Sequence, residues 1–378
     1  MRKGLLTFFN LYLAVVENGV VRRLFPLSDH SYDDLELLFF SEGGPANCLK
    51  GFGGQLCFKP PPFILLFMTE PELVTQIHPL AQPALIVLAG ATGDLGHRIA
   101  QHLLQRGARV RALVRPGNTK PAVETLRQQG ATIVEVDFND VGALTYACVD
   151  AACVVSAVSG LRDVIVDLQT RLLDAAVAAG VPRFIPSDYS IDFTKLPAGS
   201  NRNLDLRREF GQRLDGSPIA ATSILNGMFM DLLTEQAPVV LFGIRRVLYW
   251  GSADQPLDFT TIANTAAFTA AAALDATTPR YLRVAGEVAT VRGLQAAATA
   301  VTGRRFGRLR AGGLWLLKLM IQATRQLAPA PGEVFPPWQG MQYLHNMFTG
   351  APKLAPLDNA RYPEIRWTPL REVLATVP

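Results

Sequence analysis

One stretch of the sequence, residues 84–99, constrains the fold more than any other. It opens with an apolar run, Leu85–Ala89, which is typical of a buried parallel strand. The run passes directly into a turn of the pattern G-x-x-G-x-x-G, Gly90–Gly96. A helical pattern follows, and Gly107 is the expected end of that helix. Its apolar face consists of Leu95, Ile99 and Leu103.

The glycine turn predicts a site for a nucleotide diphosphate. Its glycines allow a tight turn and let backbone N–H groups approach phosphate oxygens, and the helix N-terminus adds about half a positive charge. A side chain at Gly96 would hold the helix off the strand. A lone glycine triplet is often an ordinary turn, so the flanking strand and helix carry the argument. The expected cofactor-binding residues here are Gly90, Thr92, Gly93, Asp94, Leu95 and Gly96.

The end of the next predicted strand, Ala108–Val114, indicates which dinucleotide binds. An NAD site usually has Asp or Glu about twenty residues after the glycine turn, where it accepts from the ribose 2′-hydroxyl. Here Arg115 lies nineteen residues after Gly96, with no acidic residue near it in the sequence. A guanidinium pairs with a 2′-phosphate, which a carboxylate would repel, so NADP(H) is predicted. Lys120 either adds to this pocket or is a solvated loop lysine.

Strand and helix patterns alternate as far as about residue 225, which predicts an α/β fold with a doubly wound parallel sheet. After about Met228 the alternation loosens. The further strands of the sheet are expected at Ala131–Val136, Cys153–Val158, Arg183–Ile185 and Ala220–Leu225. Beyond them we expect strands at Gly243–Trp250 and Tyr281–Ala285 and helices at Thr260–Leu274, Thr290–Thr302, Leu314–Leu327 and about Gln339–Thr349.

The carboxyl ends of the strands supply the other candidate residues, because ligands of open parallel sheets lie at that edge. Asp137 and Phe138 follow the third strand, where an adenine ring would lie. Ser156 and Val158 belong to a small-residue segment that can lie along the cofactor. The segment after the fifth strand contributes Pro186 and Ser187 to the cofactor site and Asp188 and Tyr189 as candidate catalytic residues, with Lys195 added from the following loop.

Residues 1–67 differ in composition from the rest of the chain. They hold nine of the 20 Phe but only two Ala, and their basic and acidic residues balance. Three explanations compete: a signal peptide without a clear cleavage site, an N-terminal extension, and upstream sequence ahead of a functional start at Met68. The third is preferred, with the segment read through or disordered.

Charge and cysteine usage limit the classes of function. The net charge of +4 comes from scattered basic residues, which is compatible with an anionic cofactor and does not indicate a nucleic-acid partner. Cys and His spacings do not match a metal site, and Cys148 and Cys153 are expected to be buried free thiols. The apolar helix expected at Leu314–Leu327 is interpreted as a lid or core helix and not as a membrane element. A cytoplasmic protein is predicted.

Four motifs together resemble the NmrA-like and isoflavone-reductase-like branch of the atypical short-chain dehydrogenases. They are Gly90–Gly96, Leu113–Pro116, Phe184–Tyr189 and Asn226–Phe229. The resemblance implies an NADP-binding Rossmann domain, placed at 68–231, and a smaller C-terminal α+β substrate subdomain at 232–378, some strands of which return to the Rossmann sheet. It also implies that enzyme members reduce small aromatic or quinone-like molecules, while other members only sense the cofactor.

The sequence departs from that family at one helix. The family's reductases have a lysine on the helix after the Pro-Ser-acidic-aromatic motif, whereas residues 201–210 offer Arg207 and Arg208 and no lysine. Arginine stays protonated and can only orient or polarise. We therefore expect either an NADPH-dependent reductase of a small carbonyl, enone or quinone, in which Tyr189 or Lys195 handles a proton, or a non-catalytic NADP(H) sensor. A nucleotide-sugar epimerase is disfavoured because Tyr-x-x-x-Lys is absent. A monomer or homodimer is expected.

Overall fold

The computed structural model describes residues 83–234 and 236–377, and five strands within the first 82 residues. The chain divides into two compact units, Met1–Gln82 and Pro83–Pro378. In the first unit the strands form one antiparallel sheet, β2-β1-β5, and one hairpin, β3-β4. The predicted boundary at Met68 falls inside β5. The three explanations of residues 1–67 stay predictions. The strands are β1 (Leu11–Glu17), β2 (Val20–Pro26), β3 (Cys48–Gly51), β4 (Gly54–Cys57) and β5 (Ile64–Thr69).

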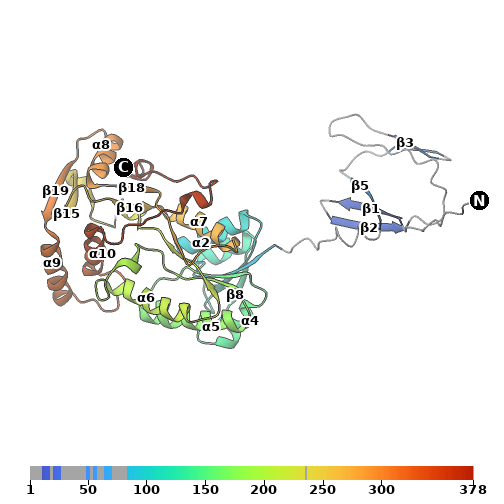
Figure 1. Ribbon diagram of the computed structural model, residues 1–378, viewed down its shortest axis with the longest axis horizontal. Coiled ribbons are helices and arrows are strands. Elements are labelled where there is room, and N and C mark those ends of the chain that lie inside the picture. Colours follow the sequence, from blue (N-terminus) through green and yellow to red (C-terminus); the bar gives the residue numbers. More distant parts are fainter. Residues whose placement is uncertain are drawn as a thin grey trace, which may run out of the picture. The chain divides into compact units, whose positions relative to one another are not determined.

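The second unit is built on a six-stranded parallel sheet with the order β11-β10-β9-β6-β7-β8 (Figure 1). The chain runs outward from β6 in one direction as far as β8 and then in the other as far as β11. This order confirms the predicted doubly wound sheet. The strands are β6 (Leu85–Ala89), β7 (Arg109–Val114), β8 (Thr132–Glu135), β9 (Cys153–Ser156), β10 (Arg183–Ile185) and β11 (Ala220–Ala221).

Helices cover both faces of this sheet, because successive side chains of β6 point to opposite sides and all are buried. Ile86 and Leu88 pack in one apolar cluster, and Val87 and Ala89 pack in another. The first cluster lies under α2 (Asp94–Gln105), α3 (Pro121–Gln128) and α7 (Ile262–Leu274), and the second under α4 (Val141–Cys148), α5 (Gln169–Ala178) and α6 (Arg202–Asp215). Cys148 and Cys153 are buried free thiols, as predicted.

The helix that precedes β10 has an irregular start. A π-helical segment, Asp163–Leu168, precedes α5. Each π turn contains more residues than an α turn and so changes which side chains face the sheet. Gln169, the first residue of α5, is completely buried. The apolar spacing of an α-helix does not show this change of phase.

The sixth predicted strand divides at Thr222. Its first half is β11, while its second half, β12 (Ser223–Leu225), pairs in parallel with β17 (Tyr281–Arg283). Two further three-stranded sheets, β13-β16-β18 and β14-β15-β19, complete this part of the unit. Their strands are β13 (Met228–Phe229), β16 (Leu257–Thr260), β18 (Glu287–Ala289), β14 (Val240–Leu241), β15 (Arg246–Trp250) and β19 (Gly307–Gly312).

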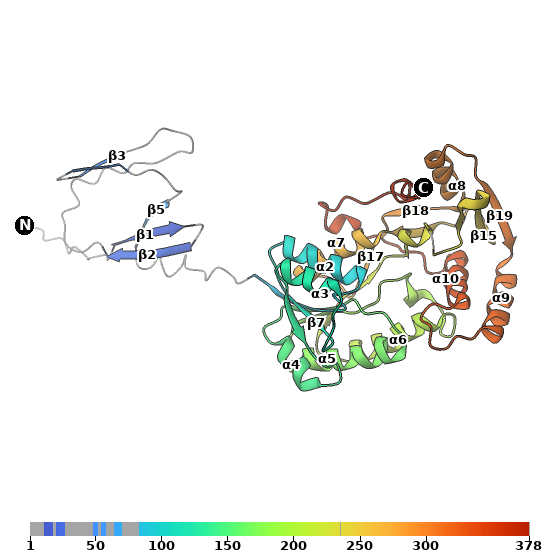
Figure 2. The ribbon, with the colours of Figure 1, turned by 180° about the vertical axis from the view of Figure 1, so that it is seen from behind.

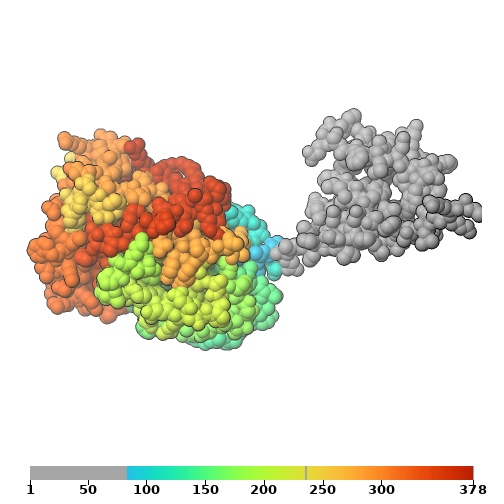
Figure 3. Space-filling view, in the orientation of Figure 1, coloured from blue at the N-terminus to red at the C-terminus, as the bar shows by residue number. Residues whose placement is uncertain are grey.

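The C-terminal helices lie beside these small sheets (Figure 2), and the segment that leads to the last helix contacts α7 and the end of α2, which cover one face of the main sheet. The Tyr362 ring lies 4.9 Å from that of Phe268, and Glu364 pairs with Arg106 at 2.9 Å. In Figure 3 the red C-terminal residues form a band across the orange and green segments. Of the described helices, none is long and apolar enough to cross a membrane. The helices are α8 (Val291–Thr302), α9 (Leu314–Leu327), α10 (Pro337–Thr349) and α11 (Leu370–Leu374).

Candidate cofactor and active site

The turn after β6 has no room for side chains at two of its glycines. Gly90 has a φ of +82°, and a Cβ there would lie 2.4 Å from the Ala157 carbonyl oxygen. A Cβ on Gly96 would lie 2.2 Å from the carbonyl oxygen of Gly90. The Gly93 N–H donates to that same oxygen at 3.0 Å and closes the turn. The backbone therefore approaches both the helix and the neighbouring strand end as closely as a phosphate-binding turn requires.

The N-terminus of α2 keeps its first-turn N–H groups free of side-chain caps. Gly93 is the N-cap residue and no side chain caps the helix there. Thr92 and Leu95 are half-buried, while Asp94 is exposed and pairs with Arg98 at 2.7 Å. Uncapped N–H groups at a helix N-terminus are donors for an anion. The arrangement fits a dinucleotide diphosphate, with Arg98 offsetting the charge of Asp94.

The predicted 2′-phosphate position lies at the end of β7, where Arg115 is exposed. No hydrogen bond or ion pair within the described residues involves the guanidinium of Arg115. The sheet, however, brings an acid to this loop: Glu135 is paired with Val114 across β7 and β8, and its Oε2 accepts from the Gly117 N–H at 3.2 Å. Lys120 is exposed on the same loop. A cation and a carboxylate thus both lie at the loop whose charge determines whether NADP(H) or NAD(H) is preferred.

The ends of β8 and β9 supply the next candidates. Asp137 is exposed and its Oδ1 accepts from the N–H of Asn139 at 2.9 Å, whereas Phe138 is buried in the core. Ser156 is completely buried, and its hydroxyl has no partner among the described residues. Val158 is half-buried. An unpartnered buried hydroxyl at a strand end fits contact with a bound group.

Ser187 ties the ends of β9 and β10 together. Its hydroxyl donates to the Val158 carbonyl oxygen at 2.6 Å, and its N–H donates to Oε1 of Gln169 at 3.0 Å. Pro186, beside it, is buried. Gln169 was not predicted from the sequence, although a glutamine between Ile165 and Leu172 on an apolar helix face is a detectable signal.

Asp188 is a buried carboxyl that forms part of a polar chain. Its Oδ2 accepts from the Ser223 hydroxyl at 2.5 Å, and Nη1 of Arg280 donates to that hydroxyl at 2.6 Å. Oδ1 has no partner among the described residues. Burial raises the pKa of Asp188, against the opposing effects of Ser223, Arg207 and Arg280. Ser223 and Arg280 are site residues that the sequence did not reveal, because β12 and β17 bring them together.

The raised pKa of Asp188 predicts a pH-dependent stability. Its contribution is fully present below the unfolded-state pKa, about 3.9, and declines as pH rises through the folded-state value. Asp188→Asn should therefore gain stability relative to the unsubstituted protein as pH increases, measured by thermal unfolding across the range. Asp254→Asn is the control, because hydrogen bonding to Arg292 lowers the pKa of exposed Asp254. A stability difference for Asp188→Asn that is constant with pH would contradict this expectation.

Of the two other candidate catalytic residues, Tyr189 is buried in the core and Lys195 is bonded to other residues. Tyr189 is 7% exposed within the core cluster that contains Phe268, and its buried hydroxyl has no hydrogen-bond partner among the described residues. Burial raises its pKa. The ammonium of Lys195 donates to the Lys353 carbonyl oxygen at 2.6 Å and lies 3.4 Å from Oδ2 of Asp192. Tyr189 was predicted at the strand end, and it lies near enough to Asp188 for the charge of that carboxylate to contribute to its raised pKa. No hydrogen bond or ion pair among the described residues joins Asp188 to Tyr189 or to Lys195.

Comparison with known proteins identifies the family of the chain. A family model described as the NmrA-like family matches residues 82–330. The chain belongs to the NmrA-like family. Pinoresinol reductase 1 of Arabidopsis thaliana is 32% identical to this NmrA-like protein over 156 residues, which are 38% of this chain and 49% of that protein. The chain spans about half the length of the curated relatives it matches.

Solved structures of similar fold extend over nearly the whole second unit. Leucoanthocyanidin reductase of Vitis vinifera with NADPH has a TM-score of 0.64 at 19% identity and covers 77% of this chain and 98% of its own. An NADPH-dependent quinone oxidoreductase of Escherichia coli with NADPH has a TM-score of 0.60 at 22% identity, with the same coverage. At these identities the likeness shows the fold. The resemblance to the NmrA-like family and the doubly wound α/β architecture are both confirmed.

The helix that lacks the family lysine, α6, points one arginine of this NmrA-like protein toward the strand ends. Arg208 is held by the carbonyl oxygens of Phe193 and Leu196, at 3.0 and 2.9 Å, and pairs with Asp205. Arg207 lies close enough to Asp188 to lower the pKa of that carboxyl, and its buried Nε–H has no partner among the described residues. Nη1 of Arg207 donates to the Asn203 carbonyl oxygen at 3.0 Å, so the guanidinium is anchored at one nitrogen and keeps the Nε–H as a donor for a ligand.

Buried amides hold α6 in this position. Gln339 of α10 donates to Oδ1 of Asn201, the N-cap residue of α6, at 2.7 Å. Asn201 in turn donates to Asn346 at 3.3 Å. Each amide is buried, so loss of one partner would leave a polar group unsatisfied. The network attaches α10 to the helix that carries Arg207.

Proposed function

We propose that the protein is an NADPH-dependent reductase of a small aromatic carbonyl, enone or quinone. The observation that carries the proposal is the turn at Gly90 and Gly96, whose missing Cβ atoms leave backbone N–H groups accessible beside an uncapped helix N-terminus. Relatives named as a pinoresinol reductase and an NADPH-dependent quinone oxidoreductase support the reaction and the cofactor. For the substrate we propose a chemical class and not a single compound.

Residues of the chain have separate roles in this proposal. Gly90–Gly96 and the α2 N-terminus hold the diphosphate, Arg115 pairs with the 2′-phosphate, and Ser156 contacts the cofactor at the end of β9. NADPH, when bound, supplies the hydride. Arg207 orients and polarises the substrate oxygen, since a guanidinium stays protonated. The buried chain from Asp188 through Ser223 to Arg280 keeps the end of β10 in place.

Cofactor binding and turnover test the proposal separately. Thermal unfolding with NADPH, NADP+, NADH and NAD+ should show the largest stabilisation for the two phosphorylated forms. Loss of NADPH absorbance with a panel of quinones and aromatic aldehydes should then reveal turnover. If neither phosphorylated form stabilises the protein, the proposed cofactor is wrong.

A second candidate function is a non-catalytic NADP(H) sensor. It is favoured by the burial of the Tyr189 hydroxyl and by the engagement of Lys195 with Lys353 and Asp192. A sensor would bind NADPH and NADP+ with measurable affinity and turn over none of the panel. Turnover of any member that depends on Arg207, tested with Arg207→Gln, would exclude it.

Tyr189→Phe measures what the buried hydroxyl contributes. Because that hydroxyl is buried beside Thr269 and makes no hydrogen bond of good geometry to a described residue, we expect turnover and NADPH affinity to change by less than about twofold and stability to stay nearly the same. Steady-state kinetics and thermal unfolding provide the readouts. A large fall in turnover at unchanged melting temperature would return Tyr189 to the catalytic set.

The remaining predictions concern partners and location. We propose a small apolar or aromatic substrate as the ligand of the site, with a monomer or homodimer as the solution state. No group of His, Cys, Asp and Glu among the described residues is arranged to hold a metal ion. The absence of a nucleic-acid or membrane partner and the cytoplasmic location stay predictions.

A further inference from the structure

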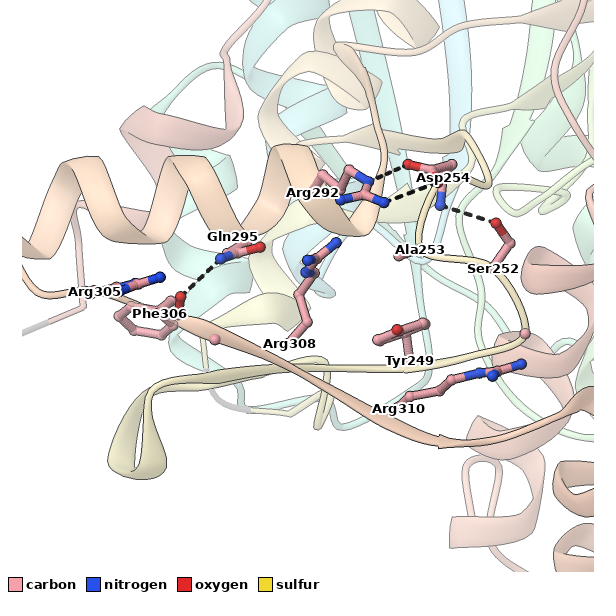
Figure 4. Close-up of a pocket in the computed structure, with 12 residues that line it drawn as sticks. Tyr249, Ser252, Ala253, Asp254, Arg292, Gln295, Arg305, Phe306, Arg308 and Arg310 are labelled. Carbon is pink, nitrogen blue, oxygen red and sulfur yellow. Dashed lines mark hydrogen bonds and ion pairs between the residues drawn. The ribbon is translucent and has the colours of Figure 1, made fainter.

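The C-terminal part of the sequence contains a long segment with one sign of charge. Between Glu287 and Glu333 there are seven Lys or Arg residues and no Asp or Glu. Four arginines, one on α8 and three around β19, line a cavity of about 860 Å³ between β15, β19 and α8 (Figure 4). They are Arg292, Arg305, Arg308 and Arg310. We call this cavity the arginine pocket.

Strand geometry explains why the guanidiniums collect here. β19 is an edge strand that pairs in parallel with β15, and Arg308 and Arg310 lie two residues apart on the same face. Tyr249 of β15 is paired with Arg310, and Figure 4 shows its ring between the two arginines. Arg292 on α8 extends from above this face. The two arginines of the strand are therefore about 6.6 Å apart along the chain, a spacing at which one ligand can reach both.

The arginine pocket has more positive charge than its own residues neutralise. Asp254, its one acidic lining residue, pairs with Arg292. Arg305, Arg308 and Arg310 have no ion pair or side-chain hydrogen bond to any described residue. Four arginines and one aspartate leave a net charge of +3 at neutral pH. Unpaired guanidiniums around a concave surface favour an anionic ligand with several acceptor oxygens.

The arginine pocket is separate from the cofactor site. β15, β19 and α8 lie at the end of the second unit opposite to α4 in both ribbon views (Figures 1 and 2). The glycine turn and Arg115 belong to β6, α2 and β7, elements that do not line this cavity. A bound NADP(H) would therefore not occupy the cavity.

We propose that the arginine pocket binds a small ligand carrying two or more phosphate groups. A guanidinium can donate two parallel hydrogen bonds to a pair of phosphate oxygens. The net charge of +3 is opposite in sign to the negative charge of a diphosphate. The pocket is open to solvent but limited in size, at about 860 Å³, and so fits a small molecule better than the extended track that a nucleic acid needs. The phosphates belong either to a free metabolite or to a lipid headgroup, since Trp315 and Leu319 of α9, just beyond β19, are 69% and 51% exposed.

Calorimetric titration of the full chain with inorganic pyrophosphate tests the proposal. Excess NADP+ is present to occupy the glycine turn, and about 0.15 M salt suppresses non-specific attraction. We expect saturable binding that Arg308→Gln with Arg310→Gln weakens about tenfold or more. Arg304→Gln is the matched control, because Arg304 is exposed on the same segment but does not line the pocket, and its binding should stay within about twofold.

Vesicle sedimentation separates the two phosphate sources. Binding to phosphatidylcholine vesicles that contain a phosphoinositide, lost in the Arg308 and Arg310 double variant, assigns the pocket to a headgroup; pyrophosphate binding alone assigns it to a free ligand. Equal weakening by Arg304→Gln overturns the proposal, and so does the absence of both pyrophosphate and vesicle binding. Retention on an RNA oligonucleotide without pyrophosphate binding also overturns it. NADPH oxidation and melting temperature should be unchanged in the double variant.

Discussion

Gly96→Ala is expected to abolish NADPH binding and to lower the free energy of unfolding by about 3 kcal/mol. The new Cβ would lie 2.2 Å from the Gly90 carbonyl oxygen and 2.7 Å from its carbonyl carbon, and both are backbone atoms that cannot move aside cheaply. Relief requires α2 to shift away from β6, which moves the helix N-terminus away from the diphosphate position. Thermal unfolding with and without NADPH measures both effects.

Gly93→Ala is the matched control for that change. Gly93 has φ −84° and ψ 163°, which alanine adopts readily, and its Cβ would meet the Gly90 oxygen at 3.4 Å, an ordinary contact. The Gly93 variant should therefore keep a melting temperature near that of the unsubstituted protein. Equal stability of the two variants would show that the turn tolerates a side chain at Gly96, and the proposed close approach would be wrong.

Arg115→Asp should reverse the preference between the two cofactors. Loss of a charge-assisted pair with the 2′-phosphate, and a carboxylate in its place, should weaken NADPH binding by about 1–3 kcal/mol, or roughly 5- to 150-fold, and leave NADH binding nearly unchanged. The exposed guanidinium has no partner to lose within the described residues, so stability should hardly change. Fluorescence titration with NADPH and NADH gives the ratio.

Glu135→Gln is the companion change at the same loop. Its carboxylate accepts from the Gly117 N–H at 3.2 Å, and a glutamine oxygen can still accept while carrying no charge. NADPH binding should tighten by about 0.5–1 kcal/mol, because a like charge near the 2′-phosphate is removed. If Arg115→Asp weakens NADPH and NADH equally, Arg115 does not contact the 2′-phosphate.

The sequence was a good guide where local pattern and burial agree. The apolar strand, the glycine turn and the helix ended by Gly107 are local features, and the structure contains each of them within about a residue. The helix predicted over Leu314–Leu327 matches α9 at both ends. The sequence did not predict β19, because an edge strand with arginines at alternate positions has no apolar run to reveal it.

The sequence did not predict the side-chain directions of Tyr189, which follows β10, and Gln169, which begins α5. Tyr189 was predicted at the carboxyl edge of the sheet and lies there, but the backbone after β10 turns its ring into the core. Gln169 faces Ser187 after a π-helical segment that no periodicity shows. In both cases a shift of one residue along the strand or helix decides whether the side chain faces solvent, the core or the site.

What the sequence determined by itself is the doubly wound sheet, the family and the glycine turn for which a diphosphate is proposed, because these depend on neighbours along the chain. Only the tertiary structure decided which distant charges meet: Glu135 beside the Arg115 loop, Arg280 beside Asp188 through Ser223, and three unpaired arginines around one cavity. Those encounters arise from strand pairing and helix packing, which bring together residues far apart in the chain and set the electrostatics of each site.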